Sequence, residues 1–183
     1  MNRFLLLLTL SLCQLCLGQS GERLITKQGQ VSFFSHTSVE DIEATNNQVL
    51  SIVDFSSQQV AISMLMRAFV FKKALMQEHF NESYIESDIY PKCSFEGKIL
   101  DLERPLPQEQ TKLIKGNITI HGVSKELEIK TKIENNQDKI SFSGTFNLTV
   151  ADFRIKIPPI VAGNISKTIE VNFSFEEYLP YEN

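Results

Sequence analysis

Residues 140–150 read ISFSGTFNLTV, and this stretch decides the fold. Its apolar residues, such as Phe142 and Phe146, alternate with polar residues, such as Ser143 and Asn147. A period of two puts the apolar side chains on one face of an extended strand and the polar side chains on the other. One buried face and one wet face are typical of antiparallel sheets, because strands of parallel sheets are buried on both faces. The stretch therefore predicts an antiparallel β-strand.

Further segments of the chain repeat this alternation. About eight such strands can bury their apolar faces by packing two sheets together or by closing one sheet on itself. Closure removes exposed edges, and a barrel of about eight strands can enclose one small ligand. We therefore predict an all-β, eight-stranded antiparallel up-and-down barrel, with a two-sheet sandwich as the alternative. The clear strands lie at 60–67, 114–120, 127–133 and 169–175, another alternates around Cys93 at 92–99, and weaker candidates lie at 23–34 and 47–55.

The connections between these strands contain turn residues and one helical stretch. Residues 122–124 and 135–138 are short separators with turn chemistry, which predicts hairpins. The stretch FKKALMQEHF at 71–80 favours a helix, whose apolar side chains either cap one mouth of the barrel or pack on its outside. Residues 38–42 are expected to add one helical turn with Ser38 as its N-cap.

The first 18 residues have the pattern of a secretory signal peptide. Arg3 gives a positive start, residues 4–17 form an apolar run, and Gly18 is a small residue at the cleavage point. The run is shorter than the roughly 20 apolar residues that a membrane-spanning helix needs. We therefore predict a signal peptide at 1–18, a barrel domain at 19–183 with no transmembrane segment after cleavage, and a periplasmic or secreted location.

Length, composition and charge exclude several classes of protein. A chain of 183 residues with 42% hydrophobic residues is long enough for one domain with a core and too apolar for a disordered tail. A formal net charge of −4 speaks against nucleic acid as a partner. Cleavage would remove Cys13 and Cys16, so the exported domain would keep Cys93 alone and form no internal disulfide. We expect Cys93 to be a small buried side chain rather than a nucleophile.

Three segments, in order, resemble the YceI-like family of periplasmic polyisoprenoid-binding proteins. ESDIYPKCSF at 86–95 is similar to the family's stretch that ends in Tyr-Pro and continues into a strand with Phe. GNITIHGVSK at 116–125 is similar to its Gly-x-Leu-Thr-Ile-x-Gly-Val-Thr-Lys hairpin and is the most specific of the three. ADFRIKI at 151–157 is similar to its late Phe-Gly-Ile segment, with Arg154 in place of Gly. The resemblance extends over about residues 29–175.

This resemblance implies a lipocalin-like barrel of eight antiparallel strands whose apolar interior binds the tail of a long isoprenoid or a similar lipid. It implies no catalysis, no metal and no cofactor beyond a bound isoprenoid or fatty-acyl lipid, and it leaves a homodimer open as the assembly. Residues 75–82 stand where the family has Arg-Asp-x-His-Leu, and Gln28-Gly29 where its first strand opens with His-Ser. The resemblance implies that these positions lie near the lipid head group.

The apolar faces of the alternating strands are the candidate ligand-binding surface. The pattern alone favours a packed core, whereas the resemblance favours the lining of a lipid cavity. Thioether side chains suit such a lining, because they adapt to variable ligand shapes. The predicted lining residues are Val60, Ile62, Met64, Met66, Ile118, Ile120, Phe142, Phe146, Val171 and Phe173.

Two other functions stay open at this point. One is a structural or stress-related barrel whose core is filled by its own side chains. The other is a hydrolase or metal-dependent enzyme that uses His79 with Glu78 or Glu82, which are close on the predicted helix. The chain has no Gly-x-Ser-x-Gly or HExxH motif, so we predict a non-enzymatic binding protein without a metal site. His121 ends a predicted strand, and we expect it to order the hairpin turn.

Overall fold

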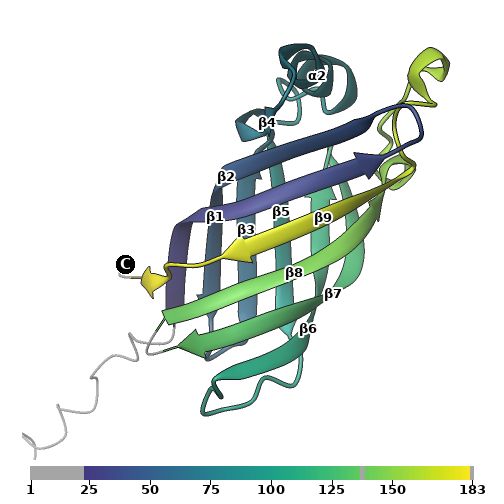
Figure 1. Cartoon of the computed structure of the whole chain (residues 1–183). Coiled ribbons are helices and arrows are strands. Elements are labelled where there is room, and N and C mark those ends of the chain that lie inside the picture. The colour runs from purple at the N-terminus through teal and green to yellow at the C-terminus, as the bar shows by residue number, and fades with distance from the viewer. Residues whose placement is uncertain (1–22, 137–138, 182–183) are drawn as a thin grey trace, which may run out of the picture.

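A closed antiparallel β-barrel forms the body of the protein in the computed structural model, which describes residues 23–136 and 139–181 (Figure 1). Each long strand pairs with the next one along the chain, and the first strand also pairs with the last long strand, which closes the sheet. The long strands are β1 (Arg23–His36), β2 (Asp41–Asp54), β3 (Gln59–Leu65), β5 (Lys92–Ile99), β6 (Glu109–Ile120), β7 (Val123–Asn136), β8 (Lys139–Thr149) and β9 (Thr168–Phe175).

This topology confirms the eight-stranded up-and-down barrel, and all strands predicted from the alternation of apolar residues are present. Two short strands add to it, β4 (Val70–Phe71) beside β2 and β10 (Leu179–Pro180) beside β1. The predicted hairpin at 122–124 is confirmed, since Ile120 pairs with Val123 across the turn. The predicted signal peptide at 1–18 lies outside the described residues.

The helical turn expected at residues 38–42 is wrong. Thr37, not Ser38, organises the connection between β1 and β2, because its side-chain oxygen accepts hydrogen bonds from the backbone N–H groups of Val39 and Glu40. The chain then returns directly into β2 at Asp41. The hydroxyl group favours a tight turn here rather than the first turn of a helix.

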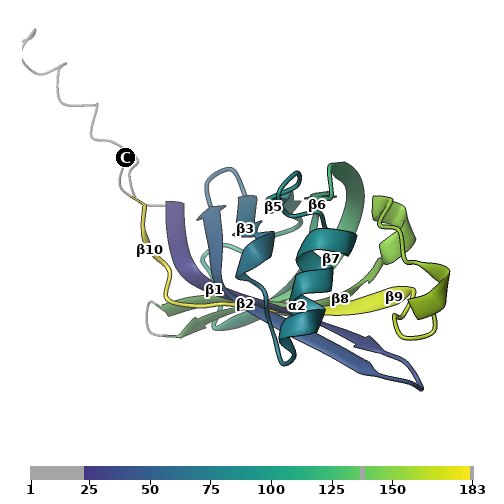
Figure 2. The same cartoon turned by 90° about the horizontal axis from the view of Figure 1, so that it is seen from above.

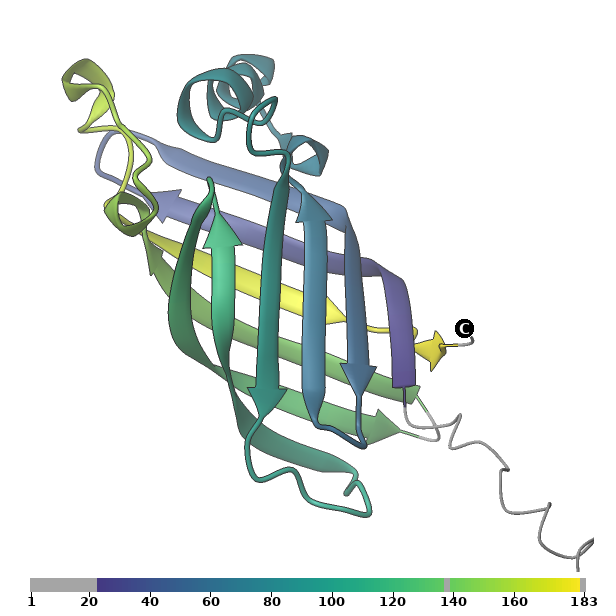
Figure 3. The same ribbon diagram turned by 180° about the vertical axis from the view of Figure 1, so that it is seen from behind.

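The two ends of the barrel differ. The helical end, at the top of Figure 1, carries the connections 37–40, 66–91, 121–122 and 150–167, whereas the opposite end carries shorter turns and the loop at 100–108. Figures 2 and 3 show the helical stretch and the loop at 150–167 as separate projections from the same end. The helical stretch comprises η2 (Met66–Ala68), α2 (Ala74–His79) and η3 (Phe80–Tyr84), and the loop contains η4 (Val150–Phe153) and η5 (Pro159–Val161).

Helix α2 falls within the helix predicted at 71–80, and the helical conformation continues through η3. Both elements are short. Over residues 23–136 and 139–181, no helix has the length and apolar character needed to cross a bilayer.

Aromatic side chains close the end of the barrel opposite the helices. The Phe142 ring lies 5.5 Å from the Tyr178 ring and 6.3 Å from the Phe55 ring, measured between centroids. The Arg104 guanidinium lies over the Phe55 ring and donates a hydrogen bond to the Phe55 carbonyl oxygen. The loop at 100–108 also buries Leu102, so apolar and aromatic groups seal this end.

Phenylalanine rings pack closely against the inner wall of the barrel where glycines leave room for them. The Phe173 ring lies over Gly144, and a methyl group placed on that glycine would lie 2.8 Å from the ring. Phe95 lies in the same way over Gly97 and Gly116, and a methyl group on either would lie 2.8 Å from its ring. Contacts between a Cβ atom and a ring carbon in real proteins are longer than this. Only glycine therefore lets these rings lie against the wall.

We expect Gly144→Ala to lower the free energy of unfolding by about 1–3 kcal/mol, because the added methyl group would overlap both the Phe173 ring and the carbonyl oxygen of Lys130. Gly163→Ala is the matched control, since a methyl group there would meet no atom within 4 Å. Urea denaturation of both variants measures the difference. Equal stabilities would show that the glycine is not required for the packing of the ring.

Candidate functional site

The barrel encloses a cavity of about 460 Å³. Inward apolar side chains of the barrel strands form much of its wall, as the alternation of their sequences dictates, and side chains from the connections at the helical end complete it. This volume lies within the range of about 300–1,000 Å³ that small-molecule sites occupy. All the residues predicted as lining contribute to the wall, namely Val60, Ile62, Met64, Met66, Ile118, Ile120, Phe142, Phe146, Val171 and Phe173.

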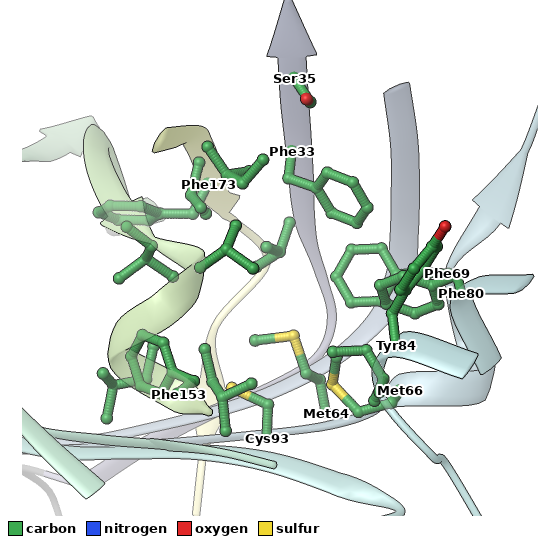
Figure 4. Close-up of a pocket in the computed structure, with 18 of the residues that line it drawn as sticks. Phe33, Ser35, Met64, Met66, Phe69, Phe80, Tyr84, Cys93, Phe153 and Phe173 are labelled. Atoms are coloured by element: carbon green, nitrogen blue, oxygen red, sulfur yellow. The ribbon is translucent and has the colours of Figure 1, made fainter. Parts of the chain in front are cut away.

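Polarisable sulfur atoms and aromatic rings face each other across this cavity (Figure 4). Met64, Met66 and Cys93 project from one wall, and the Phe153 and Phe173 side chains lie on another side of the space. Met64 is on β3, and Cys93 lies directly opposite it on β5. Flexible thioethers can follow the shape of an apolar guest without a fixed hydrogen-bond pattern.

Burial of Cys93 decides its chemistry. The residue is 3% exposed, and burial raises the pKa of the Cys93 thiol from 9.0 to about 12. A thiol with this pKa is neutral at physiological pH and is therefore a poor nucleophile. The structure thus supports the interpretation of Cys93 as a small buried apolar side chain.

The raised pKa of Cys93 predicts a loss of stability at alkaline pH. The neutral thiol stabilises the folded state, so this contribution is fully present below about pH 9 and is lost as the pH rises toward about 12. We expect the free energy of unfolding to fall with rising pH in both proteins, and more steeply in the wild type than in Cys93→Ala. The two slopes should differ by up to about 1.4 kcal/mol per pH unit. Chemical denaturation from about pH 8 to about pH 11 measures both slopes, and parallel slopes would contradict the prediction.

Polar groups inside the cavity bond to protein atoms. The hydroxyl groups of Ser51 and Tyr178 are 2.7 Å apart, and the Thr131 hydroxyl donates to the carbonyl oxygen of Ile129. Burial raises the pKa of Tyr178, so its hydroxyl stays neutral. Because these hydroxyl groups are already paired, they add little polarity to the apolar interior.

The cavity opens at the helical end. The lining residues that are most exposed to solvent, Lys73, Leu75 and His79, all belong to α2 or the residue before it. Glu40 and Asn164 add polar atoms to the same mouth from other connections. The Lys73 Nζ and Glu40 Oε1 atoms are 2.6 Å apart, so an ion pair fastens the start of the helix to the turn between β1 and β2.

An aromatic cluster holds the helical stretch over this mouth. The Phe80 ring, in η3, lies within 5.0–5.8 Å of the rings of Phe33, Phe69 and Phe71, measured between centroids. Side chains of α2 and η3 also line the cavity, among them Met76 and Phe80. Of the two interpretations of this helix, the structure favours the one in which it caps the mouth.

His121 joins two of the connections that border the mouth. Its Nδ1 atom is 3.1 Å from the carbonyl oxygen of Phe153, and its Nε2 atom is 2.8 Å from a carboxylate oxygen of Glu86. Both partners are acceptors, so the ring donates to both only when it carries two protons. The Tyr90 ring packs on it with centroids 4.3 Å apart. His121 therefore orders its own turn, as expected, and also holds the segments that contain Glu86 and Phe153.

We expect His121→Ala to lower the free energy of unfolding by about 1–3 kcal/mol, because it leaves a partly buried carbonyl group without its donor. His36→Ala is the control, since the His36 ring is exposed and its contacts, with the exposed Asp41 carboxylate and the Phe34 ring, do not involve these segments. Hydrogen exchange should accelerate at residues 85–90 and 150–154 in the first variant alone. Unchanged exchange there would show that His121 does not hold these segments.

The structure does not bring His79, Glu78 and Glu82 together. His79 borders the apolar cavity, whereas Glu78 and Glu82 border a separate polar hollow beside Arg67. Within the described part of the chain, no three His, Cys, Asp or Glu residues converge in a way that could hold a metal ion. The geometry therefore gives no support to an enzyme that pairs His79 with Glu78 or Glu82.

The sequence interpretation missed most of the mouth. The stretch aligned with the family's Arg-Asp-x-His-Leu segment does lie there, but the Phe33 and Phe69 rings and the apolar residues of the loop at 150–167 were not predicted. Ile157, Val161 and Ile165 of this loop line the cavity. In the sequence these residues lie in an uncharged run between Lys156 and Lys167. The run has no periodicity that would have identified it as part of a site.

A match to the YceI-like domain covers residues 23–177, which include all eight long strands of the barrel. The chain belongs to this family. The YceI-like chain is 25% identical to a UPF0312 protein of Pseudomonas savastanoi pv. phaseolicola, over 96% of this chain and 97% of the relative. A UPF0312 protein of Pseudomonas syringae pv. syringae matches to the same extent.

Solved structures with low sequence identity share the fold. A polyisoprenoid binding domain from Saccharophagus degradans, implicated in plant cell wall breakdown, superposes with a TM-score of 0.74 at 11% identity, over 87% of this chain and 99% of that one. Burkholderia cenocepacia BcnA superposes with a TM-score of 0.68 at 13% identity, over 81% and 96%. The Campylobacter jejuni YceI protein superposes with a TM-score of 0.60 at 16% identity, over 81% of this chain and 90% of that one.

Proposed function

We propose that this YceI-like chain is a non-enzymatic binding protein that holds an isoprenoid or another long-chain lipid inside its barrel. The apolar cavity of about 460 Å³ carries the proposal, because it offers a long tail an enclosed surface with few polar groups. The description of the Saccharophagus degradans domain as polyisoprenoid binding supports the same class of ligand. The pattern of residues 1–18 supports export to the periplasm or secretion.

The distribution of polar groups supports one orientation of the ligand. The opposite end is sealed by apolar and aromatic groups around Phe55 and Phe142, and the Ser51 and Tyr178 hydroxyl groups bond to each other. Charged side chains such as Lys73 border the mouth. A tail directed toward the sealed end, with its head group at the mouth, leaves the head group in contact with water and charge.

The alternative of a barrel filled by its own side chains has less support. A self-filled core packs at the density of an organic crystal and leaves few voids larger than a water molecule. A continuous cavity lined by Met64, Ile118 and Phe146 does not fit that description.

We expect Met64→Glu to abolish lipid binding, because it places a carboxylate among the apolar side chains of the wall. Ala61→Glu is the matched control, since Ala61 is exposed on the outer face of the same strand. The affinity for a labelled polyprenyl alcohol should fall about 100-fold or more in the first variant and stay unchanged in the control. Circular dichroism verifies that both variants are folded.

Extraction and mass spectrometry of the purified wild type should find a co-purifying lipid. Ile118→Trp offers a second variant that narrows the cavity without adding a charge, in case Met64→Glu fails to fold. A wild-type protein that is empty and also binds neither labelled isoprenoids nor fatty acids would refute the proposed function.

A further inference from the structure

The loop at residues 150–167 has two apolar faces. Its central run, IPPIVAGNIS at 157–166, contains no charged residue and is bracketed by Lys156 and Lys167. Ile157, Val161 and Ile165 line the cavity from inside the loop. Ile160 points the other way and is 93% exposed. One loop therefore borders the ligand site and presents an aliphatic tip to the surroundings.

Hydrogen bonds fix the position of this loop. The backbone N–H of Val150 donates to the carbonyl oxygen of Lys167 across its base, at 3.0 Å. The N–H of Ser166 donates to the buried hydroxyl oxygen of Ser35 on β1, at 2.9 Å. Because both ends are held, the exposed Ile160 is a fixed feature of the mouth.

Other aliphatic side chains are exposed at the same end of the barrel. Leu75 on α2 is 62% exposed although it also borders the cavity, and Val39 at the turn between β1 and β2 is 66% exposed. Three separate connections at the helical end thus present exposed apolar side chains. Exposed apolar groups that gather around a lipid cavity mark a surface that contacts an apolar partner.

The charges of the loop indicate which partner fits. Arg154, Lys156 and Lys167 are exposed and form no ion pair with other described residues, and Asp152 is the single acidic residue of the loop. In contrast, Lys73 across the mouth is neutralised by Glu40. A fixed aliphatic tip flanked by unpaired cations is complementary to the surface of a bilayer that contains anionic lipids.

We propose that the loop at 150–167 docks the mouth of the barrel on an anionic lipid bilayer, with Ile160 inserted among the lipids. This inference rests on the proposed lipid-binding function and specifies where the ligand is exchanged. Docking places the opening against the apolar layer, so a lipid tail can pass between bilayer and cavity without exposure to water. The three cations hold the loop at the headgroups.

Flotation with vesicles tests the proposal, using the protein purified after expression of the full sequence. The wild type should bind vesicles of phosphatidylcholine and phosphatidylglycerol more tightly than vesicles of phosphatidylcholine alone, and salt should weaken this binding. Ile160→Asp should weaken it about tenfold, because a carboxylate at the tip disfavours insertion. Leu179→Asp is the control, since Leu179 is 67% exposed at the opposite end of the barrel. All variants share the same N-terminal segment, so any contribution of that segment to vesicle binding is the same in each and cancels in the comparison.

Two charge-reversal variants test the role of the cations separately from that of Ile160. Lys156→Glu should weaken binding to the mixed vesicles, whereas Lys98→Glu, an exposed lysine on β5 away from the mouth, should not. Equal vesicle binding by Ile160→Asp and Leu179→Asp, or no binding by the wild type, would overturn the docking proposal. A dimer that forms in the wild type and is lost in Ile160→Asp would also overturn it in favour of self-association.

The affinity for a labelled polyprenyl alcohol in detergent-free solution separates this proposal from the proposed function. Ile160 does not line the cavity, so Ile160→Asp should bind the probe as tightly as the wild type. Normal probe binding without vesicle docking refutes the docking surface alone, whereas a wild type that is empty and binds neither the probe nor labelled fatty acids refutes the lipid-binding function itself.

Discussion

The pairing of β1 along both of its edges is the constraint on which the rest of the structure depends. β9 reaches only Gln30–Phe34 of this strand, and β10 pairs with Leu24 and Ile25 farther down. Its pairing with β2 shifts register on both sides of Gly29, close to the point where the partner on the other edge changes, and such bulges bend a strand. Tyr178 lies between β9 and β10, where its hydroxyl bonds to Ser51. Closure therefore removes the sheet edges and also brings the C-terminal segment in to complete the sealed end.

Closure encloses the apolar faces, but it does not fill the space between them. Phe95 and Phe173 pack against glycines of the wall, so these large side chains stay close to its surface. The same alternation that would build a packed core in a sandwich thus builds a lined cavity in this barrel. The cavity follows from the combination of eight strands, wall glycines and phenylalanines, and no single residue accounts for it.

The strands were predictable because their signal is local, whereas the mouth was not. The period of two identifies which side chains face inward, so residues such as Phe142 and Ile118 could be assigned to the wall from the sequence. Periodicity does not report whether the centre is filled, and the family resemblance alone suggested a cavity. The mouth combines Phe33, Phe69 and Phe80 from elements far apart in sequence, and such contacts leave no periodic trace. The error at Ser38 was also local, because adjacent hydroxyl residues offer competing turns.

The asymmetry between the two ends connects the fold with the proposed function. Aromatic packing holds the sealed end, which favours the helical end as the route of exchange for the proposed ligand. There the capping helix is fastened by the ion pair of Lys73 with Glu40, and the loop on the other side by Ser35 and His121. The ion pair and these hydrogen bonds are few and partly solvent-exposed, so they open at lower free energy than strand pairings, and the ring contacts of Phe80 must separate with them. Under the proposed function, exchange of a lipid would require movement of these connections only, while the barrel stays closed.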